Sequence, residues 1–113
     1  MANVALANDF YTYRVTWSHE DEEYLGLCVE FPSLSWLDND YAAALQGIRN
    51  VVAEVVSDMQ SNNEPIPQPL AIKRYSGNFT VRIPPDLHRR LAIQAAEDDI
   101  SINRLVSSKL NAP

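Results

Sequence analysis

The chain has 113 residues, 46% of them hydrophobic, and a formal net charge of -6. This length allows one domain of ordinary size or two small ones. No apolar run approaches the roughly 20 residues of a membrane span, and the first residues lack the basic segment and apolar run of a secretion signal. Cys28 is the one cysteine, so it forms no internal disulfide and no cysteine metal cluster. We therefore expect a cytoplasmic protein without membrane, metal or cofactor.

Acidic and basic residues are divided unevenly along the chain. Residues 1–64 hold 11 Asp and Glu against two Arg, or -9, whereas residues 65–113 hold seven Lys and Arg against four acids, or +3. Such asymmetry indicates two modules with different partners. Between them, PIPQP (Pro65–Pro69) places three prolines in five residues, where neither a helix nor a central strand continues. We predict a domain over residues 1–64, a linker over 65–76 and a second domain over 77–113.

The acidic half begins with the pattern of a β-hairpin. YTYRVTW (Tyr11–Trp17) alternates apolar and polar residues and is rich in strand formers. A polar turn, HEDEE (His19–Glu23), precedes a second strand, YLGLCVEF (Tyr24–Phe31), and SLSWL after Pro32 predicts a short third strand. The apolar residues predicted to share one face of the second strand are Leu25, Leu27, Val29 and Phe31.

A helix pattern follows these strands. Asp40 is a favourable N-cap, and the pattern predicts a helix from Tyr41 to about Gln60. Its apolar positions, which step by three or four residues, are Leu45, Ile48, Val52, Val55 and Met59. The predicted fold is therefore α+β, with a small antiparallel sheet covered by one helix in the first half.

The acidic turn between the first two strands is the best candidate for a metal site in this half. Its four carboxylates belong to Glu20, Asp21, Glu22 and Glu23. Adjacent acids in a turn converge on one ion only in a shaped loop, and no glycine provides one here. A solvated turn is therefore the favoured interpretation, and no metal site is predicted.

No catalytic residue is predicted in this half either. Cys28 and His19 have no nucleophile–base partner nearby in the sequence, which favours a structural cysteine and an exposed histidine. Four aromatic residues offer faces on which nucleic-acid bases can stack: Tyr11, Tyr13, Trp17 and Trp36. Because the surrounding charge repels phosphate, packing in the core or at a protein interface is favoured over nucleic-acid binding.

The basic half contains one strand and two helices. GNFTVRIPP (Gly77–Pro85) alternates apolar and polar residues until two prolines stop it. Pro85 and Asp86 suit the first turn of a helix that ends at EDD, and Ser101 is a favourable N-cap for a second helix, INRLVSSKLN. This unit is too small to enclose a core alone, and its strand has no neighbour to pair with.

A second copy of the chain resolves both problems. Two such strands pair antiparallel across a two-fold axis, and their apolar faces pack on four helices. The residues predicted for this dimer core are Phe79, Val81, Ile83, Leu87, Leu91 and Leu105. The opposite face of the ribbon then presents Asn78, Thr80 and Arg82 twice, and the DNA major groove admits a two-stranded ribbon. Arg suits guanine, Asn suits adenine and Thr suits either.

The stretch NFTVRIPPDLHRRLAIQAAEDDISIN resembles the ribbon-helix-helix (MetJ/Arc-type) DNA-binding fold. The resemblance implies that the base-reading residues are Asn78, Thr80 and Arg82. It also implies that the N-terminus of the second helix binds a backbone phosphate at Ser101, Ile102 and Asn103. Lys73 and Arg74 precede the ribbon, and we expect them to follow the DNA backbone as an arm. The turn between the helices has Asp99 where this fold commonly has Gly, and Asp tolerates the left-handed conformation better than most residues.

A longer series of segments resembles the HicB family of antitoxins. The series comprises the hairpin with an EFPSL-like segment, the Asp-capped DNDYAAAL helix, EPIPQP, RYSGNFTVRIPPDLHRRLAIQAA and SINRLV. This resemblance implies a degenerate RNase H-like first domain that binds HicA, a small basic RNA-cleaving toxin, and a second domain that represses the operon. The acidic first half fits a basic partner, and we place the toxin contact at Glu20–Glu23 from charge alone. PSLSWL departs from the glycine-cysteine pair that many members have near the third strand.

Three functions compete at this stage. The preferred one is a non-enzymatic antitoxin that forms a homodimer on operator DNA, with tetramers through the first domain left open. The second is a stand-alone ribbon-helix-helix transcription regulator without a toxin partner. The third is a metal-dependent nuclease on the RNase H-like scaffold, disfavoured because the acids cluster in one turn.

Overall fold

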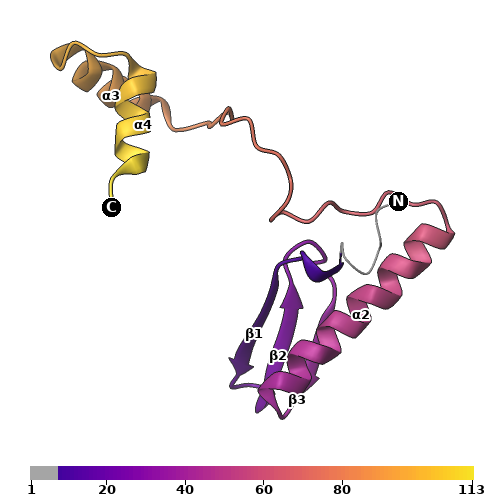
Figure 1. The fold of residues 1–113 in the computed structure, drawn as a ribbon. Helices are drawn as coiled ribbons and strands as arrows, with labels where there is room; N and C mark the ends of the chain where they lie inside the picture. The colour runs from indigo at the N-terminus through magenta and orange to yellow at the C-terminus, as the bar shows by residue number, and fades with distance from the viewer. Residues whose placement is uncertain (1–7) are drawn as a thin grey trace. The chain divides into compact units, whose positions relative to one another are not determined.

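The computed structural model describes residues 8–113, so the first seven residues of the predicted 1–64 domain lie outside it. The chain divides into two compact units, one that ends at Tyr75 and one that comprises Ser76–Pro113. Within the described residues, a three-stranded antiparallel sheet is followed by three helices (Figure 1). The predicted α+β class is therefore confirmed.

The sheet of the first unit contains the predicted hairpin. β1 (Tyr13–Ser18) pairs antiparallel with β2 (Glu23–Cys28), which pairs antiparallel with β3 (Ser35–Asp38). The turn that joins β1 to β2 places Glu22 in the left-handed region, with a φ of 54°. β2 is the central strand, and β1 and β3 are the two edges.

One helix, α2 (Tyr41–Ser61), lies across one face of this sheet (Figure 1). The Asp40 side chain caps it by accepting a hydrogen bond of 2.9 Å from the Ala43 amide, as the sequence predicts. At the other end, the Glu64 amide donates to the Met59 carbonyl and Asn63 adopts a φ of 56°. This is a Schellman ending with Asn in the position that Gly usually takes. The fully buried side chains of α2 are Ala44, Ile48, Val52 and Val56.

The covered face of β2 differs from the prediction. Gly26 and Cys28 face α2, whereas Leu25 and Leu27 lie on the opposite face of the sheet and are half-buried. The reason is the close approach of the helix: a Cβ at Gly26 would lie 2.6 Å from the Ala44 carbonyl oxygen. A similar approach occurs at Gly47 of α2, where a Cβ would overlap the ring of Trp36.

The second strand is also shorter than predicted. It ends at Cys28, and the Phe31 amide donates to the Cys28 carbonyl in a turn. Val29 is therefore 53% exposed, whereas Phe31 is buried against Tyr11, with their rings 5.2 Å apart and edge to face. The apolar alternation that predicted one long strand includes residues from this turn.

The proline-rich segment packs on the first unit. Pro69 is buried, and Ile66 packs against the core. The Tyr11 hydroxyl donates a hydrogen bond of 2.6 Å to the Pro67 carbonyl, and the Leu70 amide donates one of 2.9 Å to the Glu30 carboxylate. Residues 66–70, which we name the strap, are thus held by both side-chain packing and hydrogen bonds.

The second unit contains two helices that pack on each other, α3 (Pro85–Glu97) and α4 (Ile102–Asn111) (Figure 1). Both were predicted, with Pro85 and Asp86 in the first turn of α3 and Ser101 capping α4. Within the described part of the chain, no helix combines the length and apolar character needed to cross a membrane.

A Schellman motif ends α3. The Ile100 amide donates to the Ala95 carbonyl and the Asp99 amide donates to the Ala96 carbonyl, at 3.0 and 3.2 Å. Asp99 adopts a φ of 56°. Asp99 thus adopts the left-handed conformation expected at the position where the ribbon-helix-helix fold commonly has Gly. Both hydrogen bonds of the Schellman motif are formed.

Candidate nucleic-acid interface

The second unit has an incomplete core. Within residues 76–113, Ala95 and Leu105 are the only buried side chains. Phe79 is 75% exposed, Val81 62% and Leu110 68%. A folded unit normally buries such large apolar side chains, because each contributes about 1.5–3 kcal/mol when fully removed from water. This unit therefore leaves its largest apolar side chains without a partner.

These exposed side chains line one groove of about 830 Å³. Its walls come from the segment before α3 and from both helices. The apolar residues that line it are Phe79, Val81, Ile83, Leu91, Ile102, Val106 and Leu110. Because protein interiors are close-packed, an open apolar groove of this size makes this face a candidate binding surface.

Four of the six predicted dimer-core residues meet in this groove, namely Phe79, Val81, Ile83 and Leu91. Leu105 is instead buried within the unit, and Leu87 is half-buried outside the groove lining. Ile102, Val106 and Leu110 add a stripe from α4, spaced by four residues, and His88 adds a polar side chain from α3. The predicted dimer core included none of these four residues.

The predicted strand is not formed in the single chain. Residues 76–84 include no strand residues, and this segment approaches α3 as irregular chain. Asn78, Thr80 and Arg82, the predicted base-reading residues, are all exposed. Strand formation by this segment requires a second strand to pair with, so pairing with another copy stays a prediction.

The N-terminus of α4 presents free backbone amides. The Ser101 hydroxyl accepts a hydrogen bond of 3.0 Å from the Arg104 amide, which caps the helix. The backbone amides of Ile102 and Asn103 donate no hydrogen bond to any atom of residues 8–113. Unpaired amides and the positive end of the helix dipole favour an anion at this position, as the phosphate prediction requires.

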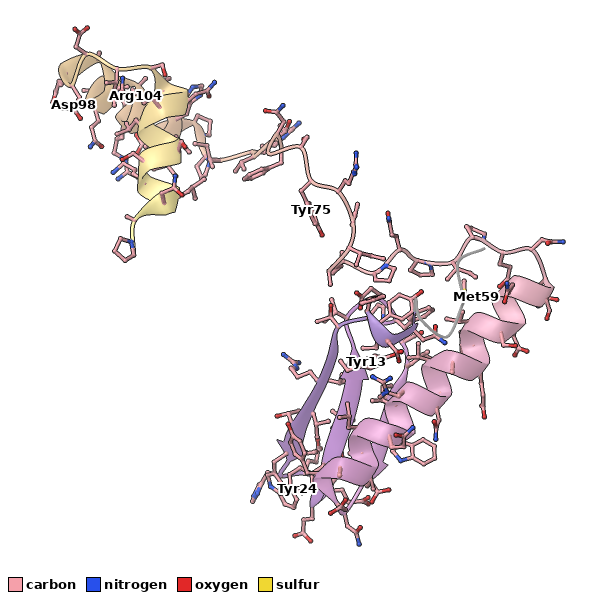
Figure 2. The ribbon with its side chains drawn as sticks, in the orientation of Figure 1. Tyr13, Tyr24, Met59, Tyr75, Asp98 and Arg104 are labelled. Carbon is pink, nitrogen blue, oxygen red and sulfur yellow. The ribbon has the colours of Figure 1, made fainter. Side chains whose placement is uncertain are left out.

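The charged residues of the second unit differ in their pairing. Arg89 and Arg90 form ion pairs with Asp86 along the surface of α3, at 2.6 and 3.4 Å. Arg82 and Arg104 have no ion-pair partner in the described part of the chain. Figure 2 shows Arg104 on α4 and Asp98 at the end of α3. Lys73 and Arg74, the predicted arm, are exposed at the end of the first unit.

Two candidates for chemistry that the sequence raised lie in the first unit, the acidic turn and Cys28. The turn Glu20–Glu23 lies on the surface, and its side chains form no metal-binding group of three or more ligands within residues 8–113. Cys28 is 2% exposed, and burial raises the pKa of its thiol, which keeps it protonated and unreactive. It packs beneath α2 as a small apolar side chain.

Fold and site together define a two-unit α+β protein whose second unit has an unfilled apolar groove and an anion-attracting helix end. The model of the HicB family matches residues 61–110, from the last turn of α2 to the end of α4. The chain is therefore similar to the HicB family over this segment, which is less than half of its length. Neither the curated proteins nor the solved structures include a significant match to the chain.

Proposed function

We propose that the chain is the antitoxin of a toxin–antitoxin system, which blocks a HicA-like, mRNA-cleaving toxin and represses its own operon. The family match over residues 61–110 supports a role related to toxin–antitoxin systems. The unfilled groove of the second unit is the observation that carries the DNA-binding part of the proposal. The acidic first unit supports the toxin-binding part.

In the proposed operator complex, a second copy fills the groove. The segments Asn78–Ile83 of two chains pair antiparallel, which satisfies their unpaired backbone groups and completes the ribbon of a ribbon-helix-helix dimer. Phe79, Val81 and Ile83 line the groove, together with Asn78, which pairing would have to turn to the opposite face. The ribbon then presents Asn78, Thr80 and Arg82 to base edges in the major groove, while the start of α4 binds a backbone phosphate.

Toxin blocking is proposed to be steric and electrostatic, with no chemistry by this chain. The residues up to 64 hold 11 acids against two arginines. A basic ribonuclease would be attracted by this field, because complementary charge accelerates encounter and discriminates between partners. Covering the RNA-binding surface of the toxin is then enough for neutralisation.

The proposal is tested with the full chain in two assays. Sedimentation at micromolar concentrations is expected to give a dimer, and a mobility-shift assay is expected to show binding to DNA upstream of its own gene. Co-expression with the neighbouring reading frame is expected to recover a small basic ribonuclease with the chain. A monomer that does not bind this DNA would overturn the operator part, and recovery of the chain alone would overturn the toxin part.

A further inference from the structure

Three aromatic rings form a continuous surface at one end of the first unit. Trp17 and Tyr24 are cross-strand partners on β1 and β2, with ring centroids 5.1 Å apart and edge to face. Tyr24 in turn lies edge to face with Tyr41, the first residue of α2, at 5.6 Å. Trp17 is 51% exposed and Tyr41 55% exposed, so the two outer rings are open to solvent. We name Trp17, Tyr24 and Tyr41 the aromatic surface.

This surface lies at the hairpin end of the sheet. Figure 2 shows Tyr24 at this end and Tyr13 at the other. The edge-to-face contacts hold the three rings against each other, so binding would cost little side-chain entropy. Large rings of this kind, held in place and half-exposed, are typical of the centre of protein interfaces.

Six carboxylates lie near the aromatic surface along the chain or across the sheet, although Glu23 points to the face of β2 opposite Tyr24. The turn of the hairpin supplies four of them, Asp38 is the cross-strand partner of Tyr24, and Asp40 immediately precedes Tyr41. The full set is Glu20, Asp21, Glu22, Glu23, Asp38 and Asp40. In the part of the chain that the structure describes, none of the six forms an ion pair.

Three of these acids have local roles. Asp21 accepts a hydrogen bond from Ser18, Asp38 from the Asp40 amide, and Asp40 caps α2. Glu20, Glu22 and Glu23 have no hydrogen-bond partner within residues 8–113. Glu22 adopts a left-handed conformation that Gly or Asn would adopt at lower cost.

Arg14 and Arg49, the basic residues of the sheet and of α2, are placed elsewhere. Arg14 points to the opposite face of β1, since its cross-strand partner is Leu27 and not a residue of the covered face. Arg49 stacks on Tyr13 and pairs with Asp9, away from the hairpin turn. Neither arginine therefore forms an ion pair with the carboxylates near the aromatic surface.

We infer that the aromatic surface binds an arginine-rich segment of a basic protein. Guanidinium groups stack on exposed Trp and Tyr rings and also form hydrogen bonds with carboxylates, so rings bordered by acids match arginine on both counts. The lysine ammonium group also pairs with carboxylates but stacks less well on aromatic rings. The inference rests on the proposed function, in which the basic protein is the toxin, and it assigns the contact to Trp17 and Tyr41 in addition to the acidic turn.

The test uses the full chain and a fluorescein-labelled peptide of nine arginines, with a nine-lysine peptide for comparison. Anisotropy at low salt is expected to show tighter binding of the arginine peptide. Tyr41→Ala and Trp17→Leu are each expected to weaken it about two- to fivefold, as for a cation–π contact at an exposed site, and to reduce the preference for arginine. Tyr75→Ala, which removes a ring that is 68% exposed in the same unit, is the matched control and is expected to have no effect.

Two triple variants with the same change in charge separate a local surface from diffuse attraction. Glu20→Gln/Glu22→Gln/Glu23→Gln removes three charges from the hairpin turn and the start of β2. Its control, Glu54→Gln/Asp58→Asn/Glu64→Gln, removes three exposed charges from the far half of α2 and the chain after it. The first triple is expected to weaken peptide binding more. Equal losses from the two triples, with equal binding of the two peptides, would overturn the inference.

Further readouts separate failure of this inference from failure of the proposed function. Circular dichroism checks that each variant folds, and Tyr41→Ala is the conservative case because Tyr41 is an exposed first residue of a helix with an intact cap. If a basic ribonuclease co-purifies equally with wild type and with Trp17→Leu/Tyr41→Ala, this inference fails and the proposed function stands. If none co-purifies but the peptide results hold, the surface stands and the toxin assignment fails.

Discussion

Tyr11 and Pro67 are 56 residues apart in the chain and are joined by a hydrogen bond of 2.6 Å from the tyrosine hydroxyl to the proline carbonyl. Tyr11 is 4% exposed, so this bond forms at the edge of the core. Together with the Leu70–Glu30 bond, it fastens the strap to the first unit at two points. The strap therefore behaves as part of that unit's structure, although its composition is that of a linker.

Tyr11→Phe is expected to loosen the strap while leaving the ring packed against Phe31. Losing one such hydrogen bond costs about 1 kcal/mol of stability. Hydrogen exchange at the Leu70 amide should accelerate, and the first unit should melt at a lower temperature. Tyr13→Phe is the control, because the Tyr13 hydroxyl donates to Asn8 and not to the strap. Unchanged exchange at Leu70 in Tyr11→Phe would show that packing alone holds the segment.

The Glu30 carboxylate predicts a pH dependence of the same attachment. Burial raises the pKa of Glu30, but hydrogen bonds from the amides of Leu70 and Thr12 outweigh it, and the net pKa is lowered. A lowered folded-state pKa contributes stability above the unfolded pKa of about 4.3, and this stability is lost as the pH falls through the folded value. Glu30→Gln should therefore destabilise the first unit at pH 7 and have a smaller effect below the folded pKa.

Denaturant unfolding of wild type and Glu30→Gln, at pH 7 and at a pH below the folded-state pKa of Glu30, measures the loss of stability at each pH. Glu64→Gln is the control, because the Glu64 side chain is exposed and makes no hydrogen bond in the described structure. An equal loss of stability in Glu30→Gln at both pH values would contradict the role assigned to the charged carboxylate.

Asp99→Gly is expected to stabilise the second unit. The left-handed conformation of Asp99 costs an ordinary residue about 1–2 kcal/mol, and Gly avoids this cost, although its greater freedom in the unfolded chain offsets part of the gain. Thermal melting of the helices by circular dichroism measures the change, at a fixed protein concentration. Asn63→Gly at the end of α2 is the matched variant and should gain less, because Asn is among the residues that tolerate this conformation best. A lower melting temperature for Asp99→Gly would mean that the aspartate carboxylate has a stabilising role.

Phe79→Asp and Arg82→Ala should separate dimer formation from base reading. Phe79 lines the groove, so a charge there is expected to prevent the pairing of two copies and with it DNA binding. Arg82 is exposed outside the groove lining, so Arg82→Ala should leave the dimer intact and weaken operator binding by about 1–3 kcal/mol. Sedimentation and mobility-shift assays with operator and unrelated DNA distinguish the two effects. A dimeric Phe79→Asp that still binds DNA would exclude the groove as the dimer interface.

The locally encoded parts of the fold were predictable from the sequence. Asp40 before an apolar periodicity predicted the start of α2, and Ser101 predicted the start of α4, because capping depends on a few adjacent residues. The turn at Asp99 was also predictable. The fold that this sequence resembles commonly has Gly there, and Asp tolerates the left-handed conformation better than most residues. The strands of the hairpin followed from the alternation in residues 11–28.

The missed features depend on contacts between distant residues. The alternation of Leu25 and Leu27 does not reveal that α2 approaches the other face of β2 so closely that Gly26 is required there. The three prolines predicted an interruption of regular structure but not the hydrogen bond from Tyr11. For the candidate site, the sequence indicated both sets of alternating side chains. The segment that carries them forms no strand here, because a strand requires a second strand to pair with and residues 8–113 provide none.

The position of Trp36 against Gly47 has a practical consequence for spectroscopy. Both tryptophans of the chain, Trp17 and Trp36, belong to the first unit, and residues 76–113 contain neither Trp nor Tyr. Fluorescence excited at the red edge of indole absorption therefore monitors the sheet and α2 alone. Far-ultraviolet ellipticity also follows α3 and α4. A transition that changes the ellipticity but not the tryptophan fluorescence would therefore belong to the second unit.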